Sequence, residues 1–397
     1  MYYLFKAIAM KKLLLITILV STVSIINAQW VEINKGLTNL EAYTFASKDN
    51  NLFVGTAGGG IFLSTNNGDK WAAVNNGLTN YTVLSLAVNG SNIYAGGPGG
   101  VFVSSDNGGN WTEINKGLTD LHVYSLLIKD NKIFAGTTNG IFISIDNGAN
   151  WTWASADIEL QQINTMASSG TNIFAGSFSG AVFLSTNEGL NWTSVSKGIT
   201  SPEIHSLSIS GNDIYASTNF NVFLSSNNGA DWTKISTGLL TVYTVASNGE
   251  IVLAGSNDSG VHLLTKDSTS WNTIYKGLIY KYVKTISIIG NNIFVGTEGL
   301  GIYRRPISEI TAIQEIIKEP TFTIAPNPFS TETTITFSEE QINTTVKIVD
   351  LLGIEYKSIK FNGKQLDIKR GDLNCGIYFI QILSENGTAM LKKIIIL

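Results

Sequence analysis

Apolar and polar positions alternate in short runs along most of the chain, and the runs repeat with a period of about forty residues. An alternating run such as "VLSLAVN" is followed by a more apolar run such as "NIYAGG". A third run such as "GVFVS" comes next, and then a fourth short segment that begins at a tryptophan. Because Gly and Asn separate the runs, the pattern predicts the four-stranded blade of a β-propeller.

The phase of the repeat predicts how the ring closes. Sets of three strands begin near residues 41, 82, 122, 162, 203, 241 and 282. The repeat is marked by seven tryptophans, Trp30, Trp71, Trp111, Trp151, Trp192, Trp232 and Trp271. The last set ends at "GIYRRP" without a fourth strand, whereas "QWVEINKG" is a fourth strand with no set before it. Joining the two predicts an all-β fold over residues 29–306, a seven-bladed propeller closed by the N-terminal strand, with two exposed strand edges removed.

A polar pattern, Ser-x-Asp-x-Gly-x-x-Trp, joins the third run to the fourth. It is complete in two repeats, has Asn in place of Asp in three, and is degenerate in the sixth copy, "LTKDSTSW". Its key positions are Asn66, Trp71, Asp106, Trp111, Asp146, Trp151, Asn187, Trp192, Asn227 and Trp232. We expect the Asp or Asn side chain to accept a backbone N–H two residues on, glycine to supply a positive φ, and tryptophan to pack against the blade.

This pattern resembles the Asp-box of sialidase-like (BNR) propellers. Asn keeps the hydrogen bond of the turn but carries no charge, so we interpret the pattern as structural rather than catalytic. The sequence "DNGGN" lacks the alternating oxygen ligands and distal Glu of a calcium loop. The three histidines form no metal or catalytic-triad spacing. We expect no metal, no cofactor and no catalytic residue in the pattern.

The resemblance to sialidases implies a cluster of three arginines that binds the substrate carboxylate. The predicted propeller has only two, the adjacent Arg304 and Arg305, so we do not expect sialidase activity. Related photosystem II assembly propellers use an arginine-rich patch that is absent here. A glycoside hydrolase needs two carboxyl groups about 5–9.5 Å apart, and such a pair stays open among Glu41, Asp120, Glu203, Asp258 and Glu298.

We expect a ligand site on the propeller face opposite the Asp-box turns, on the loops that enter each first strand and join strands two and three. The candidate residues are Tyr43, Tyr81, His122, Tyr124, Glu203, His205, Tyr243, Tyr280 and Tyr282. Aromatic rings mixed with amides and carboxylates suit carbohydrate or peptide binding; the alternative is that these tyrosines only begin strands and pack. His122 and His205 are expected to hold equivalent repeat positions, with a shared structural role.

The N-terminus predicts a secretory signal peptide over residues 1–28, because Lys11 and Lys12 precede an apolar run and Ala28 offers a cleavage point. No stable membrane span is expected after processing. A single cysteine, Cys375, excludes an internal disulfide, and we interpret it as a small buried apolar residue. The net charge of −4 and scattered lysines argue against nucleic-acid binding.

After a predicted linker over residues 307–320, the forty-residue period ends. Residues 321–397 predict a small Ig-like antiparallel β-sandwich of about seven strands. This segment resembles the type A C-terminal sorting domain of the type IX secretion system of Bacteroidota, on the motif residues Pro326, Asn327, Pro328, Gly353, Gly376, Tyr378, Lys392 and Lys393. The resemblance implies that the secretion machinery is a partner and that the protein is secreted or displayed on the cell surface. An ordinary adhesive sandwich is the alternative.

Together these patterns favour a secreted or surface-displayed propeller that acts as a binding or adhesion module, with a glycan or surface polymer as partner. The alternative is a glycoside hydrolase that uses a carboxylate pair on the loop face. We expect a binding protein rather than an enzyme.

Overall fold

The computed structural model describes residues 29–158, 161–236, 239, 241–266, 268, 270–279, 282–310, 322–350, 354–383 and 389–397. The chain divides into two compact units, one up to Pro306 and one from Ile307. The predicted signal peptide, Tyr280 and Gly353 lie outside the described residues. Within those residues, no helix has the length and apolar character needed to cross a membrane.

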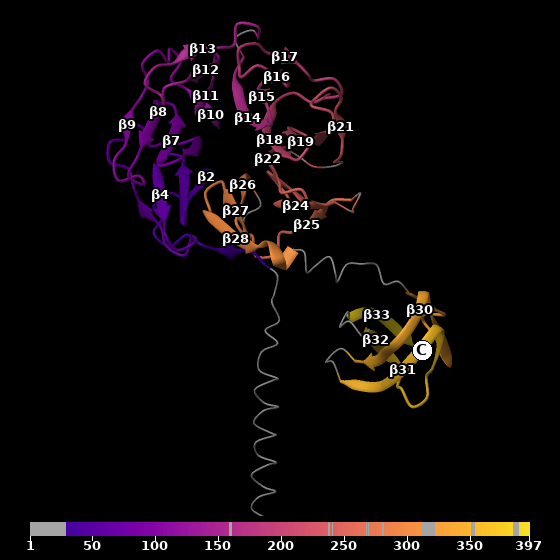
Figure 1. Ribbon diagram of the computed structural model, residues 1–397. Coiled ribbons are helices and arrows are strands. Elements are labelled where there is room, and N and C mark those ends of the chain that lie inside the picture. The colour runs from indigo at the N-terminus through magenta and orange to yellow at the C-terminus, as the bar shows by residue number, and fades with distance from the viewer. Residues whose placement is uncertain are drawn as a thin grey trace, which may run out of the picture. The chain divides into compact units, whose positions relative to one another are not determined.

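The first unit is a ring of seven four-stranded antiparallel sheets (Figure 1). The ring closes through β1 (Val31–Glu32), which pairs with β28 (Ile302–Pro306) in the register Val31 to Arg304. The innermost strands contact one another around the ring, including those of the first and last blades. The predicted seven-bladed propeller, closed by the N-terminal strand, is therefore confirmed.

Each blade uses its four strands in the same order from the centre outwards. The innermost strands are β2 (Ala42–Lys48), β6 (Ser85–Asn89), β10 (Val123–Lys129), β14 (Ile163–Ser169), β18 (Ile204–Ser210), β22 (Val242–Ser247) and β26 (Val283–Ile289). The second strands are β3 (Asn51–Thr56), β7 (Asn92–Gly97), β11 (Lys132–Thr137), β15 (Asn172–Ser177), β19 (Asp213–Thr218), β23 (Ile251–Ser256) and β27 (Asn292–Thr297).

The outer half of each blade is shorter. The third strands are β4 (Ile61–Ser64), β8 (Gly100–Ser104), β12 (Gly140–Ser144), β16 (Val182–Ser185), β20 (Val222–Ser225), β24 (Val261–Thr265) and β28. The outermost strands are β5 (Ala72–Ala73), β9 (Thr112–Glu113), β13 (Thr152–Trp153), β17 (Thr193–Ser194), β21 (Thr233–Lys234), β25 (Asn272–Thr273) and β1. After β28, residues 307–310 form one helical turn.

The second strand of each blade holds the core because it is packed on both faces between neighbouring blades. In β3, every residue from Leu52 to Thr56 is buried. Gly55 fits there because a Cβ atom would lie 2.7 Å from both Thr44 Cγ2 and the Val83 Cγ1 of the next blade. A continuous apolar run, rather than strict alternation, is the sequence signature of such a strand.

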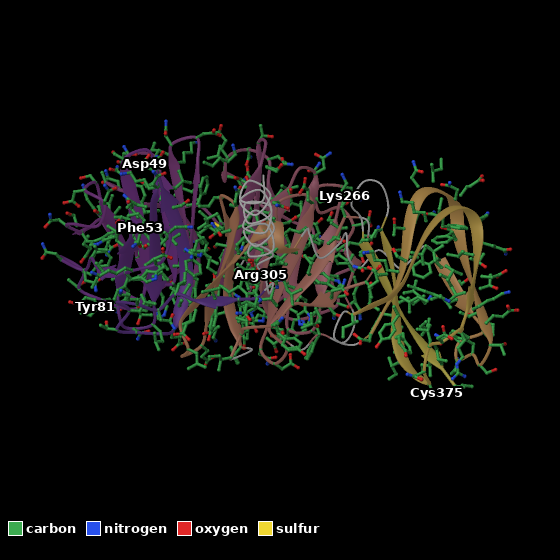
Figure 2. The ribbon with its side chains drawn as sticks, turned by 90° about the horizontal axis from the view of Figure 1, so that it is seen from below. Asp49, Phe53, Tyr81, Lys266, Arg305 and Cys375 are labelled. Carbon is green, nitrogen blue, oxygen red and sulfur yellow. The ribbon has the colours of Figure 1, made fainter. Side chains whose placement is uncertain are left out.

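The strand order gives the propeller two different faces. One face carries the turns between the first and second strands and the Asp-box loops between the third and fourth, and we call it the Asp-box face. The other carries the turns between the second and third strands and the connections between blades, and we call it the loop face. Figure 2 shows Asp49 and Lys266 on the Asp-box face and Tyr81 on the loop face.

The Asp-box loop is a closed set of hydrogen bonds. Ser104 Oγ accepts a hydrogen bond from the Gly108 N–H at 2.8 Å and donates one to Asp106 Oδ1 at 2.8 Å. Asp106 Oδ1 also accepts a hydrogen bond from the Asn110 N–H at 2.8 Å. The side-chain and backbone N–H groups of Asn110 hold the pKa of Asp106 at about 2. The predicted acceptor geometry was wrong: the bonded N–H lies four residues on, because Asn107 and Gly108, with φ of 57° and 86°, turn the chain back.

The Asn copies keep the same bond. Asn66, Asn187 and Asn227 each accept the N–H four residues on, at 2.9 to 3.0 Å. The box tryptophan reaches across to the preceding blade: Trp111 Nε1 donates to Val74 O at 2.7 Å, and its backbone N–H donates to Asn76 O at 2.8 Å. The tryptophan therefore joins neighbouring blades instead of packing only within its own.

The second unit is a five-stranded antiparallel sandwich-like sheet, which confirms the predicted fold class. Its strands are β29 (Phe322–Ala325), β30 (Glu332–Val349), β31 (Glu355–Lys369), β32 (Gly376–Leu383) and β33 (Ala389–Ile396). The count of about seven was wrong because β30 runs through 18 residues as one strand with register irregularities. Tyr378 packs in the core, and Asn327 bonds the backbone of Lys393 and Ile395.

Cys375 is exposed, so the prediction of a buried apolar residue was wrong. It lies in the turn that precedes β32, where Arg370 Nη2 is 3.4 Å from its sulfur. The buried position of this turn is taken by Leu373, whereas Asp372, Asn374 and Cys375 are exposed.

Candidate functional site

The loop-face ends of the innermost strands place two side chains of each blade in equivalent positions. Each strand is preceded or begun by a buried residue. In most blades this residue pairs with the last residue of the second strand, as Val123 does with Thr137 and Ile204 with Thr218. We call the residues on either side of this buried one the mouth positions. They are Glu41 and Tyr43, Thr82 and Leu84, His122 and Tyr124, Gln162 and Asn164, Glu203 and His205, Thr241 and Tyr243, and Tyr282 and Lys284.

This register corrects the predicted equivalence of His122 and His205. His122 precedes the buried Val123, whereas His205 follows the buried Ile204, so the two histidines lie two positions apart in the repeat. Their surroundings differ accordingly. The His122 ring is exposed and stacks on Tyr124 with a centroid distance of 5.2 Å, whereas His205 is held in a polar cluster. A shared structural role is therefore excluded.

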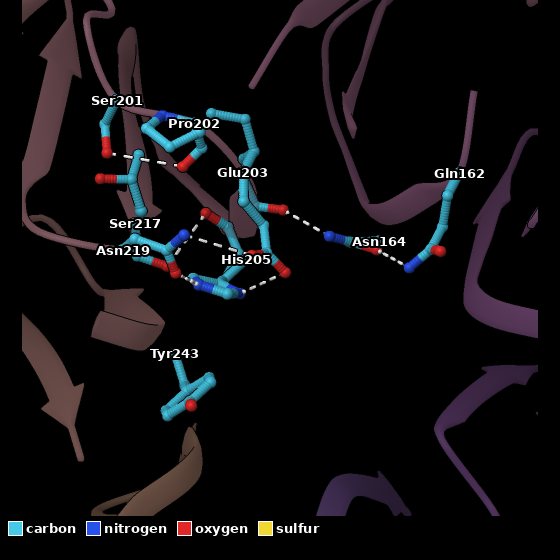
Figure 3. Close-up of polar contacts among 12 residues, drawn as sticks. Gln162, Asn164, Ser201, Pro202, Glu203, His205, Ser217, Asn219 and Tyr243 are labelled. Carbon is cyan, nitrogen blue, oxygen red and sulfur yellow. Dashed lines mark hydrogen bonds and ion pairs between the residues drawn. The ribbon is translucent and has the colours of Figure 1, made fainter. Parts of the chain in front are cut away.

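The polar cluster of blade 5 consists of Glu203, His205 and Asn219 (Figure 3). His205 Nδ1 lies 3.4 Å from Glu203 Oε1, and His205 Nε2 lies 2.7 Å from Asn219 Oδ1. Asn219 Nδ2 closes the cluster by donating to Glu203 Oε2 at 3.3 Å. The three side chains are mutually fixed, so the imidazole has one orientation toward the loop face.

Glu203 has a φ of 65°, a left-handed conformation that side chains other than Gly, Asn and Asp rarely adopt. In the described part of the propeller, the other non-glycine residues with positive φ lie in turns and Asp-boxes on the opposite face. Such a conformation costs about 1–3 kcal/mol, and here it presents the carboxylate to His205 and Asn219. The strained position therefore coincides with the fixed polar cluster.

Two tyrosines form the next part of the loop face. The Tyr243 and Tyr282 rings stack at a centroid distance of 5.2 Å and an angle of 24°, and their hydroxyl groups are 2.7 Å apart. Lys284 Nζ lies 4.6 Å from the centroid of the Tyr243 ring and 4.7 Å from that of Tyr282, and 3.2 Å from Glu298 Oε2. Burial and the hydrogen bond with Tyr282 raise the pKa of Tyr243 to about 12, so its hydroxyl is neutral near pH 7.

Contacts between blades connect these parts into one surface. The His205 ring lies 5.0 Å from the Tyr243 ring, and Asn164 Nδ2 donates to Ile204 O at 2.9 Å. Tyr43 donates to Glu41 at 2.8 Å; burial, with further contributions from Glu41, Glu298 and Tyr282, raises the Tyr43 pKa. We call this surface the loop-face arc, which spans blades 4, 5, 6, 7 and 1 and consists of Gln162, Asn164, Glu203, His205, Tyr243, Tyr282, Lys284 and Tyr43.

The arc contains five of the nine candidate residues: Tyr43, Glu203, His205, Tyr243 and Tyr282. Tyr81 is 49% exposed on the connection between blades 1 and 2, and His122 with Tyr124 forms a separate stack on blade 3. Sequence inspection missed Asn164, Asn219 and Lys284 as site residues. Asn164 and Lys284 occupy the same mouth position as Tyr43 and His205, so alignment of the repeats by the buried residue finds them.

The described residues contain no group of three or more His, Cys, Asp or Glu side chains that is arranged to hold a metal ion. The two arginines of the propeller do not form a carboxylate-binding cluster. Arg304 forms an ion pair with Asp69 at 3.0 Å, and Arg305 is buried, with 1% of its surface exposed. What the arc offers is aromatic surface, amides and ion-paired charges.

Residues 323–397 match the family model described as the secretion system C-terminal sorting domain. No curated protein sequence matches the chain. Among solved structures, the chain is similar to PorZ, an essential bacterial surface component of the type IX secretion system of human oral-microbiomic Porphyromonas gingivalis. That similarity has 12% identity and a TM-score of 0.58, and it covers 91% of this chain and 60% of the PorZ chain.

Two further structures show the same fold. One is the extracellular domain of the putative hybrid two-component system BT4673 from B. thetaiotaomicron, with 15% identity, a TM-score of 0.61, and coverage of 92% of this chain and 53% of that one. The other is YCF48 bound to D1 peptide, with 13% identity, a TM-score of 0.58, and coverage of 70% and 96%. This chain thus spans only about half to three fifths of PorZ and BT4673.

The matched tail and the ring of blades identify the two parts of the molecule and its destination. A sorting domain of this kind marks a protein for export, and it occupies the second unit. The protein is a seven-bladed β-propeller that carries a type IX secretion system C-terminal sorting domain and is exported to the cell surface or secreted.

Proposed function

We propose that the protein is a binding or adhesion module whose loop-face arc holds a glycan or surface polymer. The observation that supports this most is the continuity of the arc: Asn164 of blade 4 bonds blade 5, His205 of blade 5 contacts Tyr243 of blade 6, and Tyr243 stacks on Tyr282 of blade 7. An elongated polymer needs a surface that extends over several blades, and this one does.

The chemistry of the arc suits a polyhydroxylated ligand. The faces of half-buried tyrosine rings provide apolar contact for the C–H face of a sugar ring. Amides and hydroxyls that both donate and accept match ring hydroxyls, which do the same. Glu203 is paired with His205 of the arc and Lys284 with Glu298 beside it, so neither sign of charge dominates. This balance favours a neutral or weakly charged polymer over a polyanion.

Hydrolysis is the less favoured chemistry for this surface. The carboxylates in and beside the arc are occupied: Glu203 bonds His205 and Asn219, Glu298 pairs with Lys284, and Glu41 accepts from Tyr43. A general acid must be placed to donate its proton to the leaving group, and a carboxyl group that is already engaged by side-chain partners is poorly placed to do so.

A glycan array and a panel of bacterial polysaccharides test the proposal, with the mature chain and its Tyr243→Ala/Tyr282→Ala variant. We expect the wild-type chain to bind at least one polymer and the double variant to lose about tenfold or more in affinity, because two stacking surfaces are removed. Trp153→Ala is the matched control, since that aromatic is 47% exposed on an outermost strand away from the arc.

Three other outcomes would count against the proposal. If reducing ends appear with a polysaccharide and disappear in Glu203→Gln or Glu298→Gln, the protein is a hydrolase. If no polymer binds but a protein from the cell surface is retained by the wild-type chain and lost by the double variant, the arc recognises protein. If Trp153→Ala loses affinity as much as the double variant does, the ligand lies elsewhere.

The sorting unit is tested by removing residues 322–397. We expect the shortened protein to be lost from the cell surface and the medium and to accumulate inside the outer membrane. The full-length Cys375→Ser variant is the control, because this exposed turn residue lies outside the matched motif positions. Unchanged surface display of the shortened chain would contradict the export role.

A further inference from the structure

The Asp-box loops cover the outer apolar side chains of the preceding blade in a repeated manner. A Cβ atom on Gly108 would lie 2.9 Å from Val74 Cγ2 and 3.8 Å from a ring carbon of Phe53, both in blade 1. Gly229 has the same relation to Val195 and Phe174 of blade 4. The glycine backbone thus rests directly on an aliphatic and an aromatic side chain, with no space between them.

Blade 6 departs from this arrangement. Its segment from Thr265 to Trp271 is one residue shorter than the segment from Ser225 to Trp232 in blade 5, and it has no glycine. The residues of blade 5 that it would cover, Tyr215 and Ile235, instead line a cavity of about 950 Å³ between the two blades.

The exposure of the surrounding side chains agrees with an opened interface. Tyr215 is 8% exposed, whereas its equivalents Phe53, Phe134 and Phe174 are 0% exposed. Trp271 lines the cavity and is only partly buried, whereas the other six repeat tryptophans are 2–4% exposed. Trp271 nevertheless keeps the hydrogen bond to the preceding blade, with Nε1 at 2.7 Å from Ile235 O. The contact between the two blades therefore persists beside the cavity.

The cavity combines an apolar floor with a polar rim. The floor is made by Tyr215, Leu224, Ile235, Val252, Leu264 and Trp271. The rim carries two lysines, Lys234 and Lys266, two acids, Asp213 and Glu250, and the hydroxyls of Ser210 and Ser270. Asp213 accepts a hydrogen bond from Ser226. Positive and negative groups are therefore present in equal number around an aromatic surface.

We propose that this groove between blades 5 and 6 is a second ligand site, on the Asp-box face, and that it binds a neutral saccharide of about disaccharide size. The indole of Trp271 and the ring of Tyr215 supply the surface on which a sugar face packs. The balanced rim supplies both donors and acceptors, which ring hydroxyls need, whereas a charged ligand would require a rim of one sign. The volume lies within the range of about 300–1,000 Å³ that small-molecule sites occupy.

This site is independent of the loop-face arc, because it lies on the opposite face and uses none of the same residues. It adds a small-ligand site to a surface that otherwise holds the blades together. A variant in the groove tests this site alone, and a variant in the arc tests the proposed function alone, so either proposal can fail without the other.

The test uses saturation-transfer NMR on the mature chain with cellobiose, maltose and N,N′-diacetylchitobiose as probes. In the first variant, residues 265–271 are replaced by the blade 5 sequence of residues 225–232, which restores the glycine-containing loop. The second variant is Leu224→Trp, which fills the floor without changing the loop. We expect at least one probe to bind the wild-type chain and both variants to weaken it about tenfold or more. Tyr243→Ala, in the arc, should bind that probe as the wild type does.

Two results would overturn the proposal. One is the absence of saturation transfer to all three probes in the wild-type chain. The other is unchanged binding in the folded Leu224→Trp variant, together with loss in Tyr243→Ala, which would assign the probe to the loop-face arc. If the loop replacement fails to fold, Leu224→Trp alone decides between these outcomes.

Discussion

The two faces of the propeller are made by loops of the same strands, yet they differ in how closely the blades agree. On the Asp-box face, five loops repeat one set of hydrogen bonds: the glycine N–H donates to the serine hydroxyl oxygen, and the N–H four residues after the Asp or Asn donates to its side-chain oxygen. On the loop face, the mouth positions hold Glu, Tyr, Thr, Leu, His, Gln, Asn and Lys in different blades.

The difference separates what the fold needs from what a ligand needs. A feature that every blade repeats satisfies a requirement that every blade shares, namely closure against its neighbour. A feature that changes from blade to blade has no such requirement to meet, so it is where recognition can be built on a rigid scaffold. Blade 6 sharpens the comparison, because its sequence lacks the Asp-box glycine and a cavity lies beside it on the Asp-box face.

The largest expected effect is the loss of an inter-blade tryptophan. Trp111→Ala removes a side chain that is 4% exposed and its bond to Val74 O, and we expect it to lower the free energy of unfolding by about 3–5 kcal/mol. Trp271→Ala should cost clearly less, because that ring is only partly buried. Urea unfolding of both variants measures the difference, and an equal loss would contradict the opened interface in blade 6.

The next effect concerns the serine of the box. Ser104→Ala leaves the buried Gly108 N–H without its acceptor and removes one of the donors to Asp106, so we expect a loss of about 1–3 kcal/mol in the free energy of unfolding. Ser105→Ala is the control, since that neighbouring serine is exposed. Polymer binding on the loop face should be unchanged in both. A folded Ser104→Ala variant that loses the ligand would show that the box takes part in binding.

A smaller effect is expected for the arc. Tyr243→Phe keeps the ring but removes the hydroxyl contact with Tyr282, so it should lower the free energy of unfolding by about 0.5–1.5 kcal/mol. The Tyr243 pKa is raised from 10.0 to about 12, which means that the neutral hydroxyl is favoured by folding. This contribution is fully present below pH 10 and is lost as the pH rises toward 12. The variant should therefore lack part of the alkaline destabilisation seen by unfolding at increasing pH.

The fold was predictable because its signals are local and repeated. The phase of the repeat placed "QWVEINKG" in the last blade, and the pairing of Val31 with Arg304 agrees. The hydrogen bonds of the turn were less predictable. Which backbone N–H the Asp or Asn side chain accepts depends on the backbone angles of Asn107 and Gly108, and the identities of these two residues alone do not determine those angles. In the second unit, the strand count failed because β30 continues through its irregularities, which look like turns in the sequence.

The site was predictable only in part because it depends on which blade edges meet. Tyr243 and Tyr282 are 39 residues apart and are brought together by the packing of blade 6 against blade 7, not by any local motif. Lys284 was missed because a lysine two positions after a tyrosine has no distinctive pattern. Its position between two rings and Glu298 is visible only when blades 6 and 7 are placed side by side.

The smallest expected effect tests whether the charge of the Asp-box matters at all. Asp106→Asn should change stability near pH 7 only slightly, because Asn66, Asn187 and Asn227 accept the same N–H in the other blades. The Asp106 pKa is lowered from 3.8 to about 2, so its carboxylate favours the folded state above pH 3.8 and loses that contribution as the pH falls toward 2. Between pH 3.8 and pH 2, the free energy of unfolding should therefore change less with pH in the variant than in the wild type. Since the group is exposed, the difference will be small, and Asp146→Asn should reproduce it.

A large loss of stability in Asp106→Asn at pH 7 would mean that charge, and not only hydrogen bonding, holds the two complete boxes together. The contrast between a structural face and a ligand-binding face would then be weaker than the hydrogen bonds indicate.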